Sequence, residues 1–271
     1  MREPKLLVFD LDGTLLDGDR RIPADVRRIL FVLRDKGIQT TLATGRPFAA
    51  TRRYIEELDL PIPVIVFNGA VVAAPGGECL WSRRIPKEEA IEALRSIAGC
   101  GLPAYVYLEP ADGAFHTDRA SEAATYIQAK DGVGCEITTD LARLVEDRAH
   151  DPIKLFSIGP RETLEAVRAE FESKAPNLTC VFSEHDMLEF LGEGVTKGAA
   201  LHVLGERVGA GVDEIMAFGD NLNDLEMIRE AGVGVAMSTA PEDLHHAADV
   251  STQDLVVFLR ERFADALGME A

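Results

Sequence analysis

One stretch near the start of the chain decides the fold: Leu6-Leu7-Val8-Phe9-Asp10-Leu11-Asp12-Gly13-Thr14-Leu15-Leu16. Its unbroken apolar beginning, Leu6 to Phe9, predicts a short strand buried on both faces. Two acids follow directly. In an extended backbone, residues i and i+2 project to the same side, so Asp10 and Asp12 can address one point in space. Acids at the carboxyl end of a buried strand lie where open α/β sheets bind their ligands.

Two simpler interpretations of these acids compete with a catalytic one. Asp10 and Asp12 could be turn-forming residues after a strand. They could also begin a calcium loop of the EF-hand type, but that loop needs Gly at its sixth position and Glu at its twelfth. Counted from Asp10, those positions are Leu15 and Arg21, which excludes the calcium loop.

Composition and charge narrow the class of protein. The 271 residues, 46% of them hydrophobic and 27% charged, are typical of a soluble globular protein of about two domains. A net charge of −18 argues against a sequence-independent nucleic-acid binder, which needs a basic face. An anionic substrate would need local neutralisation by a metal, a lysine or backbone N–H groups. Four cysteines without a C-x-x-C pair predict free thiols, and with no membrane-spanning or export segment visible we expect a cytoplasmic protein.

Strands and helices alternate at both ends of the chain. Apolar spacing at i, i+3, i+4 and i+7 predicts the helices, and short buried apolar runs predict the strands. Such alternation favours a doubly wound parallel sheet with right-handed crossovers, an α/β fold. The predicted strands are 38–43, 64–67, 215–218 and 233–236, and the predicted helices are 23–36, 47–58, 196–204, 223–230, 241–247 and 255–267.

The middle of the chain has a different character. Helical stretches at 87–97 and 161–173, and a strand at 153–158, predict a separate α+β unit with its own core. We therefore expect a discontinuous core domain formed by residues 1–80 and 189–271, with an α+β domain of residues 81–188 inserted between them.

Polar residues of complementary types follow four strand ends or helix starts. A carboxylate that attacks a phosphate dianion needs a divalent cation between them, and hard oxygen ligands such as Asp10 and Asp220 suit Mg²⁺. A lysine adds a point charge for the phosphoryl oxygens, while hydroxyl, amide and backbone N–H groups donate hydrogen bonds to them. The four groups are Asp10/Asp12, Thr44-Gly45, Lys197 and Asp220/Asn223/Asp224.

These four groups, in this order, resemble the motifs of the haloacid dehalogenase (HAD) superfamily. The matching segments are Asp10 to Thr14, Thr44-Gly45-Arg46, Thr196-Lys197-Gly198 and Gly219 to Asp224. The large insertion between the second and third segments resembles the Cof-like (HAD-IIB) branch of Mg²⁺-dependent sugar-phosphate phosphatases. Asn68-Gly69-Ala70 before the insertion and Glu189 after it add to the likeness, which covers essentially the whole chain.

The resemblance implies a role for each matching position. Asp10 would be the nucleophile and form an aspartyl-phosphate, while Asp12 would protonate the leaving alcohol and then activate water. Mg²⁺ would be held by the Asp10 carboxylate, the Asp12 backbone carbonyl and Asp220, with Asp224 supporting the metal site. The inserted domain would close over the substrate. The groups expected to hold the phosphoryl group are the Leu11 backbone N–H, Thr44, Gly45, Lys197 and Asn223.

The sequence departs from the family at Ser238-Thr239, where Gly-Asn is usual, and at His245-His246, where a Lys is common; neither position touches the phosphoryl chemistry of the family. Arg46 is open between an ion pair and a substrate contact. Other polar residues of the insertion are interpreted as surface or packing residues, with substrate contact as the alternative: His116, Arg119, Lys154, Glu184 and His185.

The expected activity is Mg²⁺-dependent hydrolysis of a small phosphomonoester, such as a sugar phosphate, by a monomer or homodimer without nucleic-acid or membrane partners. Two alternatives remain open. A phosphosugar mutase would pass the phosphoryl group to a second hydroxyl, and a non-catalytic sensor would only bind the phosphometabolite.

Overall fold

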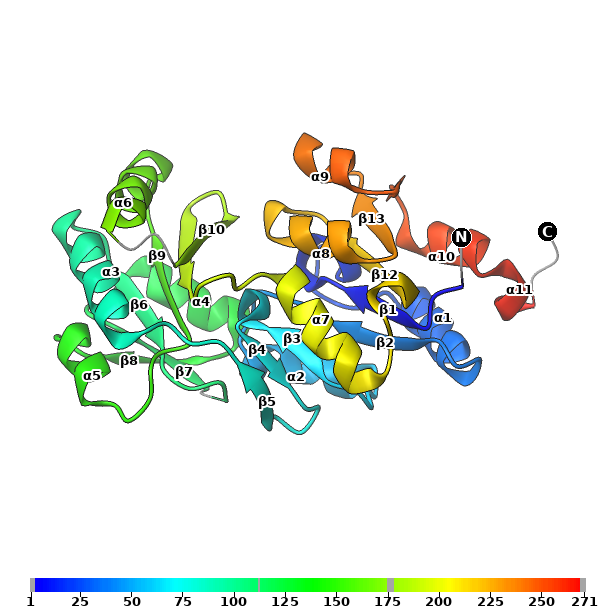
Figure 1. The fold of residues 1–271 in the computed structure, drawn as a ribbon, viewed down its shortest axis with the longest axis horizontal. Coiled ribbons are helices and arrows are strands. Elements are labelled where there is room, and N and C mark those ends of the chain that lie inside the picture. Colours follow the sequence, from blue (N-terminus) through cyan, green and yellow to red (C-terminus); the bar gives the residue numbers. More distant parts are fainter. Residues whose placement is uncertain (1–2, 112, 175–177, 269–271) are drawn as a thin grey trace. The chain divides into compact units, whose positions relative to one another are not determined.

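The computed structural model describes residues 3–111, 113–174 and 178–268 (Figure 1). The chain forms two compact units. The first consists of Met1–Thr44, Arg53–Ile65 and Lys197–Ala271, and the second of Gly45–Arg52 and Val66–Thr196.

The first unit is built on a five-stranded parallel sheet, which confirms the predicted α/β class. Its strands lie in the order β14-β13-β12-β1-β2. A parallel bridge between Ala43 and Ile65 places β3 (Val64–Val66) beyond β2. The sheet strands are β1 (Leu6–Phe9), β2 (Gln39–Leu42), β12 (Ile215–Gly219), β13 (Val233–Met237) and β14 (Val250–Thr252).

Two groups of helices flank this sheet, as a doubly wound fold requires (Figure 1). In one group α1 (Ala24–Asp35) contacts α10 (Leu255–Arg262) and α11 (Ala264–Leu267). In the other, α8 (Leu225–Glu230) contacts α7 (Lys197–Val208) and α9 (Glu242–Ala247). The helix α2 (Phe48–Glu57) connects β2 to β3.

The prediction of one terminal helix over residues 255–267 is wrong. The helix is interrupted at Phe263, whose φ of −118° and ψ of 28° leave the helical region. Phe263 is only 2% exposed, so packing of its ring against the core overrides the helical pattern of the surrounding sequence. The predicted helix from Asn223 also begins differently, as a 3₁₀ turn over Leu222–Asp224.

The second unit contains a six-stranded sheet with its own hydrophobic core. Its order is β10-β11-β9-β6-β7-β8, antiparallel except between β7 and β8. A hairpin of β4 (Val71–Ala73) and β5 (Cys79–Ser82) belongs to the same unit. The six strands are β6 (Ala104–Tyr107), β7 (Ala114–Thr117), β8 (Gly134–Ile137), β9 (Lys154–Ile158), β10 (Thr179–Glu184) and β11 (Met187–Leu191).

The two faces of this second sheet differ. Side chains such as Leu155 and Phe190 pack with the helices α3 (Lys87–Gly99), α5 (Leu141–Asp147) and α6 (Arg161–Lys174). Because side chains alternate along a strand, the neighbouring residues face the other way. That opposite face carries stacked and edge-to-face aromatic rings, among them Tyr105, Tyr107 and Phe156. The helix α4 (Glu122–Asp131) contacts β8, and the predicted α+β character of the insertion is confirmed.

Within the part of the chain that the structure describes, none of the helices combines the length and apolarity that crossing a bilayer requires.

Close packing in the parallel sheet gives a first prediction. A Cβ added to Gly234 of β13 would lie 2.3 Å from the Ile228 carbonyl oxygen. Overpacking of this kind typically destabilises a protein by about 1–3 kcal/mol. We expect Gly234→Ala to lower the free energy of unfolding in urea by that amount. Gly18→Ala, where a Cβ meets nothing within 4 Å, is the control; equal stabilities for the two variants would contradict the close packing.

Candidate active site

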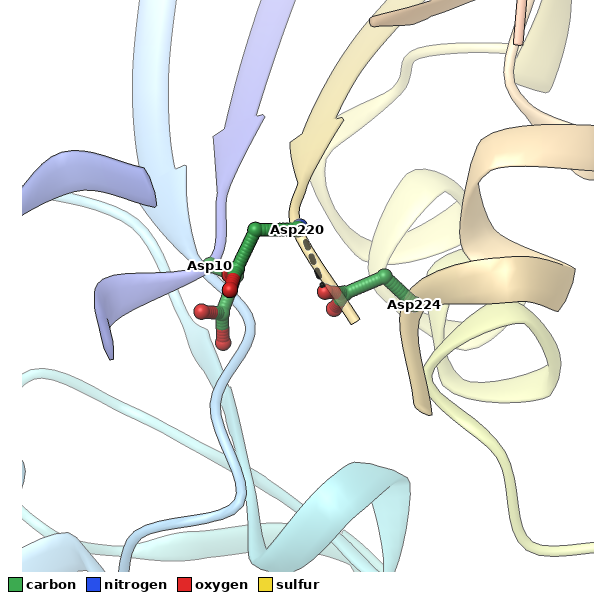
Figure 2. A group of neighbouring side chains, drawn as sticks. All are labelled: Asp10, Asp220 and Asp224. Carbon is green, nitrogen blue, oxygen red and sulfur yellow. Dashed lines mark hydrogen bonds between the residues drawn. The ribbon is translucent and has the colours of Figure 1, made fainter. Parts of the chain in front are cut away.

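The parallel pairing of β1 with β12 brings two acids together from opposite ends of the sequence. Phe9 is paired with Phe218, so the chain reaches Asp10 and Asp220 at the same edge of the sheet. The Asp10 amide donates to the Phe218 carbonyl at 3.0 Å, which extends the ladder to the first acid itself. Figure 2 shows both acids leaving the ends of their strands, with Asp224 beside them.

Three carboxylates form one compact group at this edge. Among the described residues, Asp10, Asp220 and Asp224 each offer a carboxylate oxygen within 4.8 Å of the others. Asp10 and Asp224 are buried, at 6% and 0% exposure. Oxygen donors in such a group suit a hard divalent cation, so the residues present fit a metal site.

The turn after β12 fixes the position of Asp224. Its Oδ2 accepts hydrogen bonds from the backbone amides of Asp220 at 3.0 Å and Asn221 at 3.1 Å. Gly219 permits this close turn, because a Cβ there would lie 2.5 Å from the Asp224 Cβ. The backbone therefore holds one carboxylate oxygen and leaves the other to face the site.

Lys197 joins the two buried carboxylates. Its Nζ lies 2.6 Å from Asp10 Oδ1 and 2.6 Å from Asp224 Oδ1, and the side chain is fully buried. Lys197 is the first residue of α7, and Gly198 lets this helix start close to α8, since a Cβ on Gly198 would lie 2.7 Å from Glu226 Cβ. The predicted meeting of Lys197 with the acids is therefore present in the structure.

The charges of this group shift its pKa values. Burial raises the pKa of Asp10 well above its ordinary value, and the neighbouring carboxylates of Asp224 and Asp220 add to the effect, while Lys197 opposes it. Burial likewise raises the pKa of Asp220 to about 6, assisted by the charge of Asp224. For Lys197, burial favours the neutral form, but the charges of Asp10 and Asp224 outweigh it and raise the pKa.

Thr14 is a site residue that sequence reasoning missed. Its hydroxyl donates to Asp220 Oδ1 at 2.9 Å across 206 positions of sequence. The chain turns at Gly13, with φ of 85°, and a Cβ there would lie 2.3 Å from Asp220 Oδ2. Only the D-x-D-G-T spacing could have suggested this contact, since the hydroxyl follows the glycine that permits the turn.

The remaining predicted residues follow strands of the same parallel sheet. Thr44 follows β2, the strand beside β1; it is buried, and its amide donates to the Ile65 carbonyl at 2.9 Å, with Gly45 next in the chain. Asn223 lies in the 3₁₀ turn before α8. Leu11 is buried, whereas the half-buried Asp12 lies outside the three-carboxylate group.

The structure also gives the surroundings of three further residues that the sequence singled out: Arg46, His245 and Lys154. Arg46 Nη1 lies 3.7 Å from Asp131 Oδ1, and the two side chains are 4% and 10% exposed. His245 lies 2.9 Å from the Ser251 hydroxyl through Nδ1. Lys154, interpreted as a surface or packing residue, is buried in an ion pair with Glu189.

Comparisons with known proteins show which family this chain resembles. The family model of haloacid dehalogenase-like hydrolases matches residues 7–255. The HMP-PP phosphatase of Cronobacter sakazakii is 31% identical over 89% of this chain and 86% of its own. The 5-amino-6-(5-phospho-D-ribitylamino)uracil phosphatase of Bacillus subtilis is 27% identical over 97% of this chain and 98% of its own.

Solved structures show the same fold. A haloacid dehalogenase-like hydrolase from Bacteroides thetaiotaomicron superposes with a TM-score of 0.83 at 26% identity, covering 96% of this chain and 100% of that one. A HAD subclass IIB sugar phosphatase superposes with a TM-score of 0.81 at 25% identity, covering 96% and 98%.

The parallel sheet with three carboxylates at its carboxyl edge defines an α/β protein with a candidate metal site. The family match over residues 7–255 shows that the chain belongs to the haloacid dehalogenase-like hydrolase family. Within that superfamily it is a phosphatase of the Cof-like, subclass IIB type.

The raised pKa of Asp220 gives a prediction about stability. An acid whose pKa is about 6 in the folded protein, against 3.8 ordinarily, binds its proton more tightly when folded. Its ionisation therefore destabilises the metal-free protein as the pH rises from about 4 to above 6. We expect Asp220→Asn, which cannot ionise, to be more stable than the native chain at pH 8 by on the order of 1–3 kcal/mol.

The same comparison at pH 4 is the internal control, because there Asp220 is largely protonated in the folded protein and the difference should nearly vanish. Urea unfolding in the presence of EDTA at both pH values measures this difference in the free energy of unfolding. A native chain that is equally or more stable than the variant at pH 8 would contradict the burial of an unfavourable charge.

Proposed function

We propose that this phosphatase hydrolyses a small phosphomonoester in a Mg²⁺-dependent reaction, through an aspartyl-phosphate on Asp10. One observation carries the proposal: Lys197 Nζ lies 2.6 Å from both Asp10 and Asp224, beside Asp220, in a buried group at the carboxyl edge of a parallel sheet. A buried nucleophile needs cationic surroundings before a phosphate dianion can approach it.

The proposed metal ion follows from the net charge of this group of side chains. Three carboxylates and one lysine ammonium leave the group negative when all are ionised. Burial is the main cause of the raised pKa values of Asp10 and Asp220, and the neighbouring carboxylates raise them further. A divalent cation would neutralise it and lower the charge repulsion between Asp10 and the phosphoryl oxygens. Asp10, Asp220 and the Asp12 backbone carbonyl would hold Mg²⁺, supported by Asp224.

The chain's own residues would carry the two chemical steps. In the first, an Asp10 carboxylate oxygen attacks phosphorus and the bond from phosphorus to the ester oxygen breaks, while the Asp12 carboxyl gives its proton to the departing alcohol. In the second, Asp12 takes a proton from water, whose oxygen attacks phosphorus. The bond to Asp10 breaks, and inorganic phosphate leaves.

The phosphoryl oxygens would be held by donors from the strand ends. Lys197 supplies an ammonium that is already fixed by two carboxylates. The Thr44 hydroxyl, the Asn223 amide and the backbone N–H groups of Leu11 and Gly45 would supply neutral donors, in the way an anion site requires.

Residues 81–188 would act as a cap that closes over the substrate and selects the leaving group, with residues 1–80 and 189–271 as the catalytic core.

The relatives' names support small phosphorylated metabolites as substrates, since they include HMP-PP, a phosphoribitylamino-uracil and sugar phosphates. Because these substrates differ outside the phosphoryl group, they favour a common reaction at the phosphoryl group, with the cap selecting among leaving groups. Four free cysteines agree with action in a reducing cytoplasm.

Removing the nucleophile tests the reaction class. We expect Asp10→Asn, which keeps the side chain's size, to lower Mg²⁺-dependent phosphate release from a panel of phosphomonoesters by at least about 10³-fold. Asp19→Asn changes an exposed acid in the same region and serves as the matched control. Release that survives in Asp10→Asn would refute the covalent route, and an isomerised phosphosugar in place of free phosphate would identify a mutase.

The pKa of Asp220 also predicts how metal binding depends on pH. Ligands must lose their protons to bind a metal, so the apparent dissociation constant for Mg²⁺ should rise at least about tenfold per pH unit below pH 6. The Thr14 hydrogen bond opposes the raised pKa, so Thr14→Val should move this onset to higher pH. Isothermal titration calorimetry between pH 5 and 8 measures both; a pH-independent affinity would contradict Asp220 as a ligand.

A further inference from the structure

A second buried ion pair lies in the second unit, on the sheet face opposite α3, α5 and α6. Lys154 Nζ donates to Glu189 Oε1 at 2.7 Å, and the two side chains are 6% and 2% exposed. The Ser183 hydroxyl donates to the same oxygen at 2.7 Å, and Asn68 Nδ2 donates to Glu189 Oε2 at 2.7 Å. Both carboxylate oxygens of Glu189 therefore accept hydrogen bonds inside the protein.

The sheet register assembles this cluster. Glu189 on β11 lies opposite Phe156 on β9, which makes Lys154 its diagonal neighbour on the same face. On the other side, the pairing of β10 with β11 shifts between Phe182 and Glu184. A bulge there re-aims the extra residue, Ser183, toward Glu189.

Two side chains of this cluster, Lys154 and Asn68, contact the same residue, Gly45. Lys154 Nζ also donates to the Gly45 carbonyl oxygen at 3.2 Å. Asn68, which also donates to Glu189, packs against the Gly45 Cα so closely that a Cβ there would lie 2.9 Å from Asn68 Oδ1. Glu189 thus holds two side chains, and each of them contacts the same backbone residue.

The residues flanking Gly45 are fixed as well. The Thr44 amide donates to the Ile65 carbonyl at 2.9 Å, and the Arg46 carbonyl accepts from the Phe67 amide at 3.0 Å. Gly45 lies between these two anchors, and the Lys154 hydrogen bond and the Asn68 contact fix its own orientation. Stability alone is a weak reason for such a cluster, because replacing a buried ion pair by apolar residues is often neutral or stabilising.

We propose that Lys154 and Glu189 are positioning residues for the phosphoryl-transfer reaction: together with Asn68 they hold the backbone at Gly45 so that its N–H can bind the phosphoryl group. The inference rests on the proposed function, in which the Gly45 N–H is a phosphoryl donor. Preorganised donors act without reorganising during the reaction, which is where this arrangement would contribute.

The sequence permits a direct probe of Gly45. Thr44-Gly45 is the only Thr–Gly pair in the 271 residues. Cell-free synthesis with carbonyl-¹³C threonine and ¹⁵N glycine therefore leaves one amide, that of Gly45, directly bonded to a ¹³C carbonyl. A carbonyl-selected NMR spectrum of the whole protein then contains one resonance, which can be followed while inorganic phosphate is added with Mg²⁺ present.

The decisive variant is Lys154→Met/Glu189→Gln, which removes both charges and keeps approximate size. We expect its Gly45 resonance to differ from the native position before phosphate is added, and its half-saturating phosphate concentration to rise about tenfold. The matched control is Lys174→Met/Glu170→Gln, the same chemical change in an exposed pair of α6; its resonance and titration should match the native ones. If the double variant does not fold, Glu189→Gln should give a smaller change in the same direction.

A Gly45 resonance and phosphate titration identical in native and variant protein would overturn the proposal, even if the variant's melting temperature falls. A native resonance that ignores phosphate while esters are hydrolysed would also overturn it and leave the proposed function standing. A resonance that responds to phosphate and to the variant, in a protein that hydrolyses no ester, would uphold the role of Lys154 and Glu189 in positioning the Gly45 N–H for phosphate binding and refute the proposed catalysis.

Discussion

The candidate site depends on one buried ammonium shared by two carboxylates. Lys197 is fully buried and lies 2.6 Å from both Asp10 and Asp224. Without it, two carboxylates would be buried next to each other unpaired, a situation that typically destabilises a protein by about 3–5 kcal/mol. Lys197 therefore makes it possible to bury Asp10 at all, and burial sets the electrostatic environment of that carboxylate.

Parallel strand pairing is what brings these residues together. Asp10, Lys197 and Asp224 come from both ends of the chain, and each stands at a strand end or helix start on one side of the sheet. The sheet fixes the backbone, and glycines at 13, 198 and 219 let neighbouring segments approach to distances that a Cβ would forbid. The site is thus a property of close backbone packing as much as of its acids.

Local pattern was enough to predict much of this arrangement. The strands around Leu6–Phe9 and Ile215–Gly219 are uninterrupted apolar runs, and a parallel sheet necessarily gathers their carboxyl ends at one edge. The pattern could not predict the break at Phe263, because the apolar period continues through it and only tertiary packing interrupts the helix.

Contacts that depend on register were also beyond the sequence. The bond from Thr14 to Asp220 requires knowing how two distant turns meet. The pairing of Lys154 with Glu189 requires the register of an antiparallel sheet and the bulge at Ser183. A lysine in a strand is usually solvated, and nothing in the residues around Lys154 distinguishes it from such a residue.

The two buried lysines can be compared by the charge that surrounds each. Lys154 meets one carboxylate, Glu189, so this cluster is neutral, and both Glu189 oxygens accept hydrogen bonds within the protein, from Lys154, Asn68 and Ser183. Lys197 instead belongs to a group with three carboxylates, so the group carries a net negative charge when all are ionised; burial, assisted by the neighbouring carboxylates, raises the pKa values of Asp10 and Asp220. A neutral, internally satisfied cluster is suited to holding a backbone in place. A group left negative by its own residues is suited to binding a cation, and the difference follows from counting charges rather than from the position of either lysine in the sequence.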